Sequence, residues 1–259
     1  MQTVQVEFPA EWESCNVYAV ADWHIGDRHS VQHEIDQQIK RIKDDPHGLV
    51  VLNGDLLNTA LRNSVSDIYG ETAKPMDQIL MLVGMLKPIS EKIIGVTLGN
   101  HEERIYREDG VDIMRLVCRE LGCEDKYCPE GVLIFLRFGA TRSHKGGKKK
   151  RLFTLYATHG SGGGRKEGAK AIRMADMAAV VDADIYIHSH SHLPMVFPES
   201  YFRVNIGNNS VQEVEKLFIN TGAKLSYGGY GQIKEFKPNS RRYPVVHLYA
   251  KDGTATATL

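Results

Sequence analysis

Short apolar runs alternate with helix-like segments along the first part of this 259-residue chain, and each apolar run ends in polar residues. The runs cover residues 15–21, 49–52 and 93–98. The segments between them carry apolar residues at helical spacing, which predicts helices that include residues 31–42 and 79–86. Strands that alternate with helices in this way indicate an α/β fold, in which helices cover a sheet.

The second half of the chain has a different character. The hydrophobic pattern predicts helices over residues 111–121 and 169–181, and strands over 132–138, 152–158, 184–187, 201–206, 216–220 and 245–249. We find no internal repeat, long linker or low-complexity tract. We therefore expect residues 1–259 to form a single domain, with core motifs over 22–194 and C-terminal strands over 195–259.

Charge and hydropathy exclude several classes of protein. Lysine and arginine total 32, as do aspartate and glutamate, which excludes a globally basic nucleic-acid coat and an acidic disordered tail. No uncharged apolar run approaches the roughly 18–20 residues of a membrane span, and residues 1–10 lack the pattern of a secretory signal. We expect a cytoplasmic protein without a membrane partner, and the sequence leaves its oligomeric state open.

Four cysteines are too few and too unevenly spaced to indicate a disulfide framework. Cys118, Cys123 and Cys128 share a five-residue spacing, but this matches none of the usual zinc patterns. We expect all four, Cys15 included, to be ordinary thiols in a reducing compartment.

Polar residues gather where the predicted strands end. They are Asp22 and His24 in DWH, Asp55 in GDLLN, Asn100 and His101 in GNHE, His159 in THG, and His188, His190 and His192 in HSHSH. Ligands of open α/β sheets bind at the carboxyl ends of strands, so we expect these five groups to meet at one site. The spacings Asp22-x-His24 and His190-x-His192 predict that each pair points to one face, as in a strand.

Such a site would offer two carboxylates, an amide oxygen and several imidazoles, without a thiolate. This mixture suits divalent first-row metals. The six or seven ligands are too many for one tetrahedral zinc ion but suit two ions that share a carboxylate. Two divalent ions and two aspartates leave a net charge of +2, enough to hold a hydroxide and a phosphoryl group. Metal pairs about 3.5–4 Å apart commonly catalyse displacement at phosphorus.

The ordered series Asp-x-His, Gly-Asp-x-x-Asn, Gly-Asn-His-Glu, His-Gly and His-x-His, between Asp22 and Pro194, resembles the calcineurin-like metallophosphoesterase superfamily. The resemblance implies a four-layer sandwich with two central mixed β-sheets flanked by helices. It also implies a dinuclear hydrolase that attacks phosphate esters with a metal-bridging hydroxide. Manganese is the expected ion, with iron, nickel, zinc and cobalt as alternatives.

The resemblance further implies a role for each residue. The first metal would be held by Asp22, His24 and His192, the second by Asn100, His159 and His190, with Asp55 as the bridge. His101 would contact the phosphate or protonate the leaving oxygen. The sequence departs from the family at Ser189, where glycine is usual and serine is expected to alter the turn slightly, and at Asn58, where aspartate is common. We interpret His188 as a structural or ligand-orienting residue and not as a ligand.

Two segments bear on the substrate. The basic loop 142–151 either holds a phosphate-rich substrate, such as nucleic acid, or is a solvated hairpin tip. The glycine-rich segment 160–168 predicts substrate contact through Arg165 and Lys166, with a flexible connection as the alternative. We therefore expect a phosphodiester substrate, with nucleic acid as a candidate. The alternatives are a phosphomonoesterase or phosphoprotein phosphatase, and a non-catalytic binding scaffold.

Overall fold

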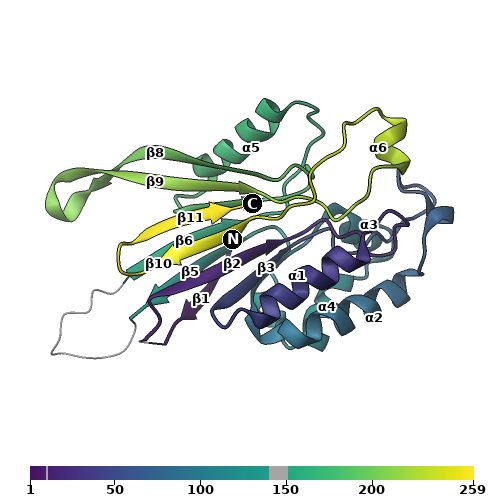
Figure 1. Cartoon of the computed structure of the whole chain (residues 1–259), viewed down its shortest axis with the longest axis horizontal. Helices are drawn as coiled ribbons and strands as arrows, with labels where there is room; N and C mark the ends of the chain where they lie inside the picture. The colour runs from purple at the N-terminus through teal and green to yellow at the C-terminus, as the bar shows by residue number, and fades with distance from the viewer. Residues whose placement is uncertain (10, 140–150) are drawn as a thin grey trace.

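The computed structural model describes residues 1–9, 11–139 and 151–259, and consists of two mixed β-sheets that lie face to face (Figure 1). Helices cover the outer face of each sheet, which gives the four layers that the resemblance implies. The predicted basic loop 142–151 lies outside the described residues except for Arg151. Among the described residues, no helix is both long and apolar enough to cross a membrane.

The five-stranded sheet has the order β11-β10-β2-β3-β4. Its strands are β2 (Ser14–Val20), β3 (Gly48–Asn53), β4 (Ile93–Thr97), β10 (Val245–Tyr249) and β11 (Thr254–Thr258). Strands β2, β3 and β4 run parallel, whereas β10 and β11 pair antiparallel. The carboxyl ends of the three parallel strands therefore lie at one edge of the sheet.

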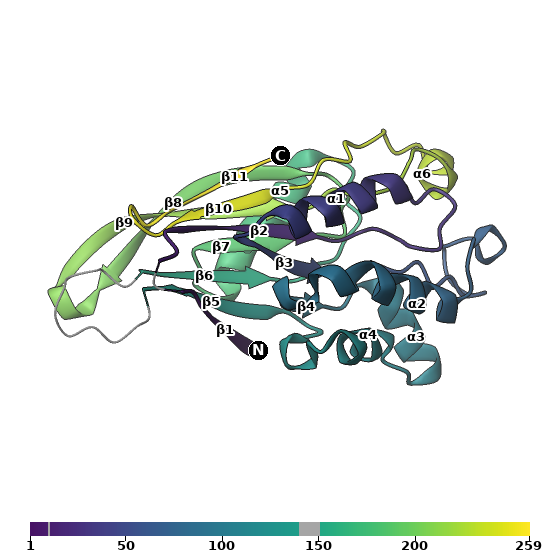
Figure 2. The ribbon, with the colours of Figure 1, turned by 60° about the horizontal axis from the view of Figure 1, so that its bottom comes forward.

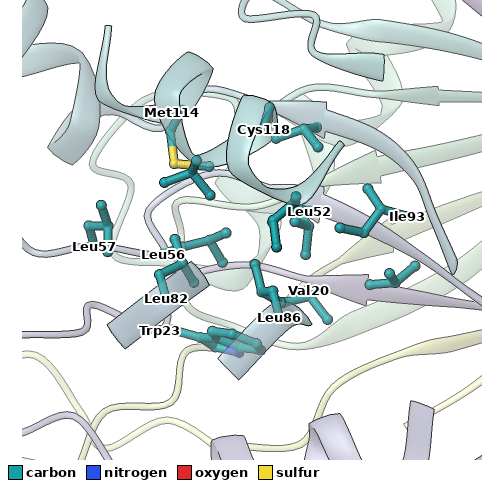
Figure 3. Packing of buried hydrophobic residues seen from close by; sticks show 14 of the residues in the cluster. Val20, Trp23, Leu52, Leu56, Leu57, Leu82, Leu86, Ile93, Met114 and Cys118 are labelled. Atoms are coloured by element: carbon teal, nitrogen blue, oxygen red, sulfur yellow. The ribbon is translucent and has the colours of Figure 1, made fainter. Parts of the chain in front are cut away.

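Helices cover the outer face of this sheet, as Figure 2 shows. They are α1 (Gln32–Asp44), α2 (Pro75–Leu86), α3 (Asn100–Asp109) and α4 (Ile113–Leu121). Their apolar residues pack against Val20, Leu52 and Ile93 of the sheet, with Trp23 among them (Figure 3). Trp23 is fully buried, and its Nε1 donates to Gln38 Oε1 of α1 at 3.1 Å, so its polar atom is satisfied.

The six-stranded sheet has the order β1-β5-β6-β7-β9-β8. Its strands are β1 (Gln2–Glu7), β5 (Val132–Phe138), β6 (Arg151–Ala157), β7 (Ile185–His188), β8 (Met195–Asn205) and β9 (Ser210–Asn220). The α5 helix (Glu167–Val180) packs on the outer face of this sheet through Met174 and Met177. Strands β6, β7 and β9 run parallel, so their carboxyl ends also share one edge.

Short elements complete the chain. They are α6 (Gly229–Ile233) and the 3₁₀ turns η1 (Ile68–Gly70), η2 (Lys87–Lys92), η3 (Glu124–Lys126) and η4 (Ile206–Asn208). The inner faces of the two sheets enclose a second core that includes Val17, Val51, Ile134 and Leu155. All four cysteines are buried free thiols within the two largest cores, as expected of ordinary packing residues.

The structure adds elements that the hydrophobic pattern did not reveal. Helix α3 has the sequence NHEERIYRED, in which Ile105 is the buried apolar residue, so no amphipathic stripe marks it. The predicted helix 111–121 begins instead at Ile113, because the Asp112 side chain accepts from the Arg115 N–H and caps it. Strands β8 and β9 form one long hairpin where short strands were predicted, because most of its side chains are only partly buried or exposed.

Candidate metal centre

The predicted site residues meet where the strand ends of the two sheets come together. Asp22 and His24 follow β2, Asp55 follows β3, and Asn100 begins α3 just after β4, while His159 follows β6 and His190 and His192 follow β7. Three overlapping groups of possible ligand atoms result, and within each group all atoms lie within 4.8 Å of one another. The expected convergence on one site is thus present in the structure.

Asp55 and His24 join these groups to one another. One group consists of Asp22, His24 and His192, another of Asp55, His159 and His190, and the third of His24, Asp55 and His101. Asp55 Oδ2 lies 3.1 Å from His159 Nε2, and Asp22 Oδ1 lies 3.3 Å from His192 Nε2. Asn100 lines the same pocket as His159 and His190 of the second group. The arrangement resembles two adjoining ligand sets with Asp55 between them.

Five of the seven predicted ligands have left-handed backbones. The φ angles are 54° at Asp22, 48° at His24, 52° at Asp55, 65° at His190 and 56° at His192. The prediction that each pair would share a face as in a strand is therefore wrong in its reason, because left-handed turns aim these side chains. Such conformations cost about 1–3 kcal/mol each in non-glycine residues and cluster at functional sites.

A buried carboxylate from α3 holds the turn that carries Asp55. Glu102 Oε2 accepts from the N–H of Asp55 at 3.0 Å and of Gly99 at 3.2 Å, and Oε1 accepts from the N–H of Leu57 at 2.9 Å. Burial and the charge of Asp55 raise the pKa of Glu102 to about 7, against the N–H bonds, which favour the ionised form. Glu102 is not among the predicted site residues, although a Glu three residues after a helix N-cap is a capping signal.

Gly54 is required at the same turn. Its φ of 81° is in the left-handed region, and a Cβ there would lie 2.6 Å from Gly99 N and 2.7 Å from His159 Nδ1. The Gly-Asp pair of the motif therefore serves packing as well as chemistry, since only glycine lets these loops approach so closely.

Backbone carbonyls orient two imidazoles. His159 Nδ1 lies 2.7 Å from Asn53 O, and His101 Nδ1 lies 3.0 Å from Asn58 O. A carbonyl can only accept, so Nδ1 carries the proton in both rings, and Nε2 presents its lone pair in the neutral form. This arrangement is typical of metal-binding histidines. Asn58 also donates through Nδ2 to Glu71, so the residue that replaces the family's aspartate helps to hold the ring of His101.

The electrostatics suit a cation at this place. Burial, together with the neighbouring His101, lowers the pKa of His24 well below its ordinary value, and burial lowers that of His101 to about 4. Burial also opposes protonation of His159, but the charges of Asp55 and Asp22 outweigh it and raise that pKa to about 10. The same attraction holds the pKa of Asp55 well below its usual range despite its burial. The two carboxylates thus draw positive charge to the centre.

Buried atoms without hydrogen bonds provide a direct test of whether these residues fit metal ions. Within the described residues, Asp22 Oδ1, His159 Nε2 and His190 Nδ1 are buried and make no hydrogen bond of acceptable geometry, although the first two lie within ion-pair distance of His192 and Asp55. A buried polar atom left in this state costs about 1–3 kcal/mol. All three belong to the ligand groups, and carboxylate oxygens with imidazole nitrogens are donors that first-row divalent ions accept. The residues present fit the metals that the sequence predicts.

His188 and Ser189 support the site from behind. His188 is buried, its Nδ1 lies 2.8 Å from Asn220 Oδ1, and it belongs to none of the ligand groups. Ser189 Oγ accepts from Asn53 Nδ2 at 2.6 Å, and the left-handed angle falls on the following residue, His190. Ser189 therefore holds the turn by a hydrogen bond, and its own backbone does not adopt the left-handed angle that favours glycine.

Arg165 and Lys166, the predicted substrate contacts, are not among the residues that line the pocket beside the metal ligands. The Arg165 guanidinium carbon is 5.1 Å from the centroid of the Phe236 ring, and Lys166 is the exposed residue before α5. A pocket of about 260 Å³ beside the second ligand group is lined by Gly160 and Ser161 of the glycine-rich segment, but by neither Arg165 nor Lys166. Substrate contact through these two residues stays a prediction.

The chain resembles several solved structures at low sequence identity. No curated protein matches the sequence significantly. Among solved structures, Vacuolar Protein Sorting 29 from Cryptosporidium parvum is 15% identical, with coverage of 95% of this chain and 96% of that chain and a TM-score of 0.47. A predicted phosphoesterase from Streptococcus pneumoniae TIGR4 is 14% identical (95% and 97% coverage, TM-score 0.37). A Zn²⁺ complex of Vps29 from Entamoeba histolytica is 12% identical (94% and 97%, TM-score 0.38).

The sequence model of calcineurin-like phosphoesterases matches residues 16–194, more than half of the chain, and the match includes every predicted metal ligand. The chain therefore belongs to the calcineurin-like phosphoesterase family.

Proposed function

We propose that the protein is a dinuclear, manganese-dependent phosphodiesterase. Membership of the family supports a metal-dependent hydrolase that acts on phosphate esters. The observation that carries the dinuclear assignment is the position of Asp55, which belongs to one ligand group with His159 and His190 and to another with His24. A carboxylate placed between two ligand sets is what a shared, bridging ligand requires.

Each ion would have its own set of side chains. The first would be held by Asp22, His24 and His192, the second by Asn100, His159 and His190, and both by Asp55. When bound, two such ions supply Lewis acidity that polarises a phosphoryl oxygen and lowers the pKa of water. The protein supplies left-handed turns that aim the ligands before any ion arrives.

His101 is the residue we assign to the phosphate and the leaving oxygen. Its Nε2 lies 3.9 Å from Asp55 Oδ2, beside the centre, and its Nδ1 is held by Asn58 O. The His101 side chain keeps some exposure, which a residue that contacts the substrate requires. A negatively charged phosphate next to this ring would favour its protonation, which suits an imidazole that donates a proton to the leaving group.

Preference for a diester rests on basic residues of the sequence, of which Arg165 and Lys166 lie in the glycine-rich segment that directly follows His159. Arg165 and Lys166 would add positive charge next to the hydrolysed phosphate, and the basic loop 142–151 would add charge for a longer phosphate backbone. A nucleic acid is therefore the partner we propose for this enzyme. A scaffold is the weaker alternative, because a purely structural role would not require buried ligand atoms without hydrogen bonds or five ligand residues with left-handed backbones.

The test compares hydrolysis of bis-p-nitrophenyl phosphate with that of p-nitrophenyl phosphate by metal-stripped protein reconstituted with manganese. We expect faster turnover of the diester and loss of activity in Asp55→Ala. Faster turnover of the monoester would contradict the diester assignment. Two bound metals without hydrolysis of either ester would contradict catalysis and favour the scaffold.

A further inference from the structure

The pocket of about 260 Å³ beside the second ligand group contains two arginines that neither the metal site nor His101 accounts for. We call it the α3 pocket. It is lined by Leu98, Gly99, Asn100, Glu103, Arg104, Arg107, His159, Gly160, Ser161 and His190. Because Asn100, His159 and His190 are predicted ligands of the second metal, a substrate bound there would extend directly into this pocket.

Arg104 is the arginine of the α3 pocket that has no salt-bridge partner among the described residues, although the charges of Asp55, Glu102 and Glu71 act on it. Arg107 Nη2 donates to Glu103 Oε1 at 2.8 Å, so these two charges largely cancel. Arg104 is half-buried, and its Nη1 donates to the hydroxyl of Ser66 at 3.1 Å. Within the described residues its guanidinium forms no salt bridge, which leaves donors of its fork available to a ligand.

Two further features favour an anion over a base or an apolar group. The first turn of α3, a ten-residue helix, contributes Gly99 and Asn100 to the lining, and the positive end of a helix dipole attracts negative charge. Among the residues that the structure describes, no Phe, Tyr or Trp lines the pocket, so these residues offer no platform on which a nucleobase could stack. Its volume is also below the range typical of sites for whole drug-sized ligands.

We propose that the α3 pocket binds a second phosphate of the substrate, adjacent to the phosphate that is hydrolysed, and that Arg104 contacts it. The planar guanidinium of an arginine can donate two hydrogen bonds to the oxygens of one phosphate. The hydrogen bond to Ser66 holds the Arg104 guanidinium in place. This inference rests on the proposed function and narrows it to phosphodiesters that carry a neighbouring phosphate. Two sources share this chemistry, a nucleoside bisphosphate ester and a nucleic-acid strand.

The test uses two esters with the same leaving group. Thymidine 5′-(p-nitrophenyl phosphate) has no second phosphate, and its 3′-phosphorylated form has one. For the wild-type protein loaded with manganese, we expect kcat/KM to be about 10- to 100-fold higher for the 3′-phosphorylated ester, the size expected of one hydrogen bond between charged groups. Arg104→Gln should remove this preference, and Arg104→Lys should restore part of it. Arg119→Gln, an exposed arginine of α4 outside the pocket lining, serves as the matched control.

Equal kcat/KM for the two esters in the wild-type protein would overturn the proposal, as would a preference that survives Arg104→Gln. Circular dichroism of each variant establishes that it is folded. A p-nitrophenyl ester of oligothymidylate distinguishes the sources, because a strand should raise kcat/KM beyond the nucleoside bisphosphate ester only if the natural substrate is a nucleic acid.

A binding measurement separates this proposal from the proposed function. If the wild-type protein hydrolyses neither ester, the diesterase assignment fails, and calorimetric titration with thymidine 3′,5′-bisphosphate and thymidine 5′-monophosphate tests the pocket alone. Tighter binding of the bisphosphate that disappears in Arg104→Gln would support the pocket. Equal affinity for the two nucleotides would overturn it.

Discussion

The hydrogen bonds to Glu102 make a quantitative prediction about what holds the metal-binding turn. In Glu102→Gln, one of the two carboxylate oxygens becomes an NH₂ group, which cannot accept. The less costly orientation keeps the oxygen at Oε2, where it accepts from Asp55 and Gly99, and turns the NH₂ group toward the N–H of Leu57. One buried N–H then lacks its acceptor, which costs about 1–3 kcal/mol. Glu102→Ala removes both acceptor oxygens, and with them all three hydrogen bonds, and should cost roughly 3 kcal/mol or more.

The assay is urea unfolding of the metal-free protein, followed by circular dichroism. We expect the midpoint of Glu102→Gln to fall without a change of the m-value. Glu120→Gln is the control, since Glu120 is an exposed residue of α4, where such a substitution is usually worth less than about 0.5 kcal/mol. If Glu102→Gln unfolds at the same urea concentration as this control, the hydrogen bonds do not hold the turn and the reasoning is refuted.

Three further predictions concern other parts of the molecule. Ser189→Gly removes the hydroxyl that accepts from Asn53, so we expect the free energy of unfolding to fall by about 1–2 kcal/mol, seen as a lower urea midpoint. This is expected even though glycine is the residue usual in the family. His101→Gln should lower kcat at least about 100-fold for diesters with an alkyl leaving group, and less for p-nitrophenyl esters, whose leaving group needs no proton. A hydrogen bond from Lys216 helps to hold the pKa of Asp182 below its usual range, despite some burial. This ion pair therefore stabilises the fold above about pH 4, and the stabilisation is lost as the pH falls further. Asp182→Asn should accordingly make the stability less dependent on pH below about pH 4.

Each of these predictions has an outcome that contradicts it. A Ser189→Gly variant as stable as the wild-type protein would show that the turn does not depend on the serine. Equal losses of kcat on alkyl and nitrophenyl esters would exclude His101 as the proton donor. An unchanged acid-unfolding curve in Asp182→Asn would show that this partly exposed ion pair contributes no stability.

The ligands could be predicted from the sequence because they follow apolar strands, and parallel strands bring their carboxyl ends together. Asp22, Asp55 and His159 each stand directly after such a run, so order along the chain translates into proximity. The strand pairing that achieves this, with β2, β3 and β4 in one sheet and β6 and β7 in the other, has no comparable local signal.

The residues of α3 that support the site, and the left-handed backbone angles, could not be predicted in the same way. Glu102 and Arg104 lie on a helix with almost no apolar periodicity, so the pattern that reveals buried helices does not reveal α3. Left-handed angles at His24 and His190 follow from tertiary contacts, because local preference in a non-glycine residue opposes them. The strained turns therefore become visible only in the folded chain.

The most direct test of the dinuclear centre is its metal content. Metal-free protein is dialysed to equilibrium against manganese, and the bound metal per chain is measured by mass spectrometry for the wild-type protein and for Asp55→Ala. We predict two manganese ions per wild-type chain and fewer than two in the variant, because Asp55 belongs to ligand groups on both sides of the centre. One ion or none per wild-type chain at saturating manganese would contradict the central claim.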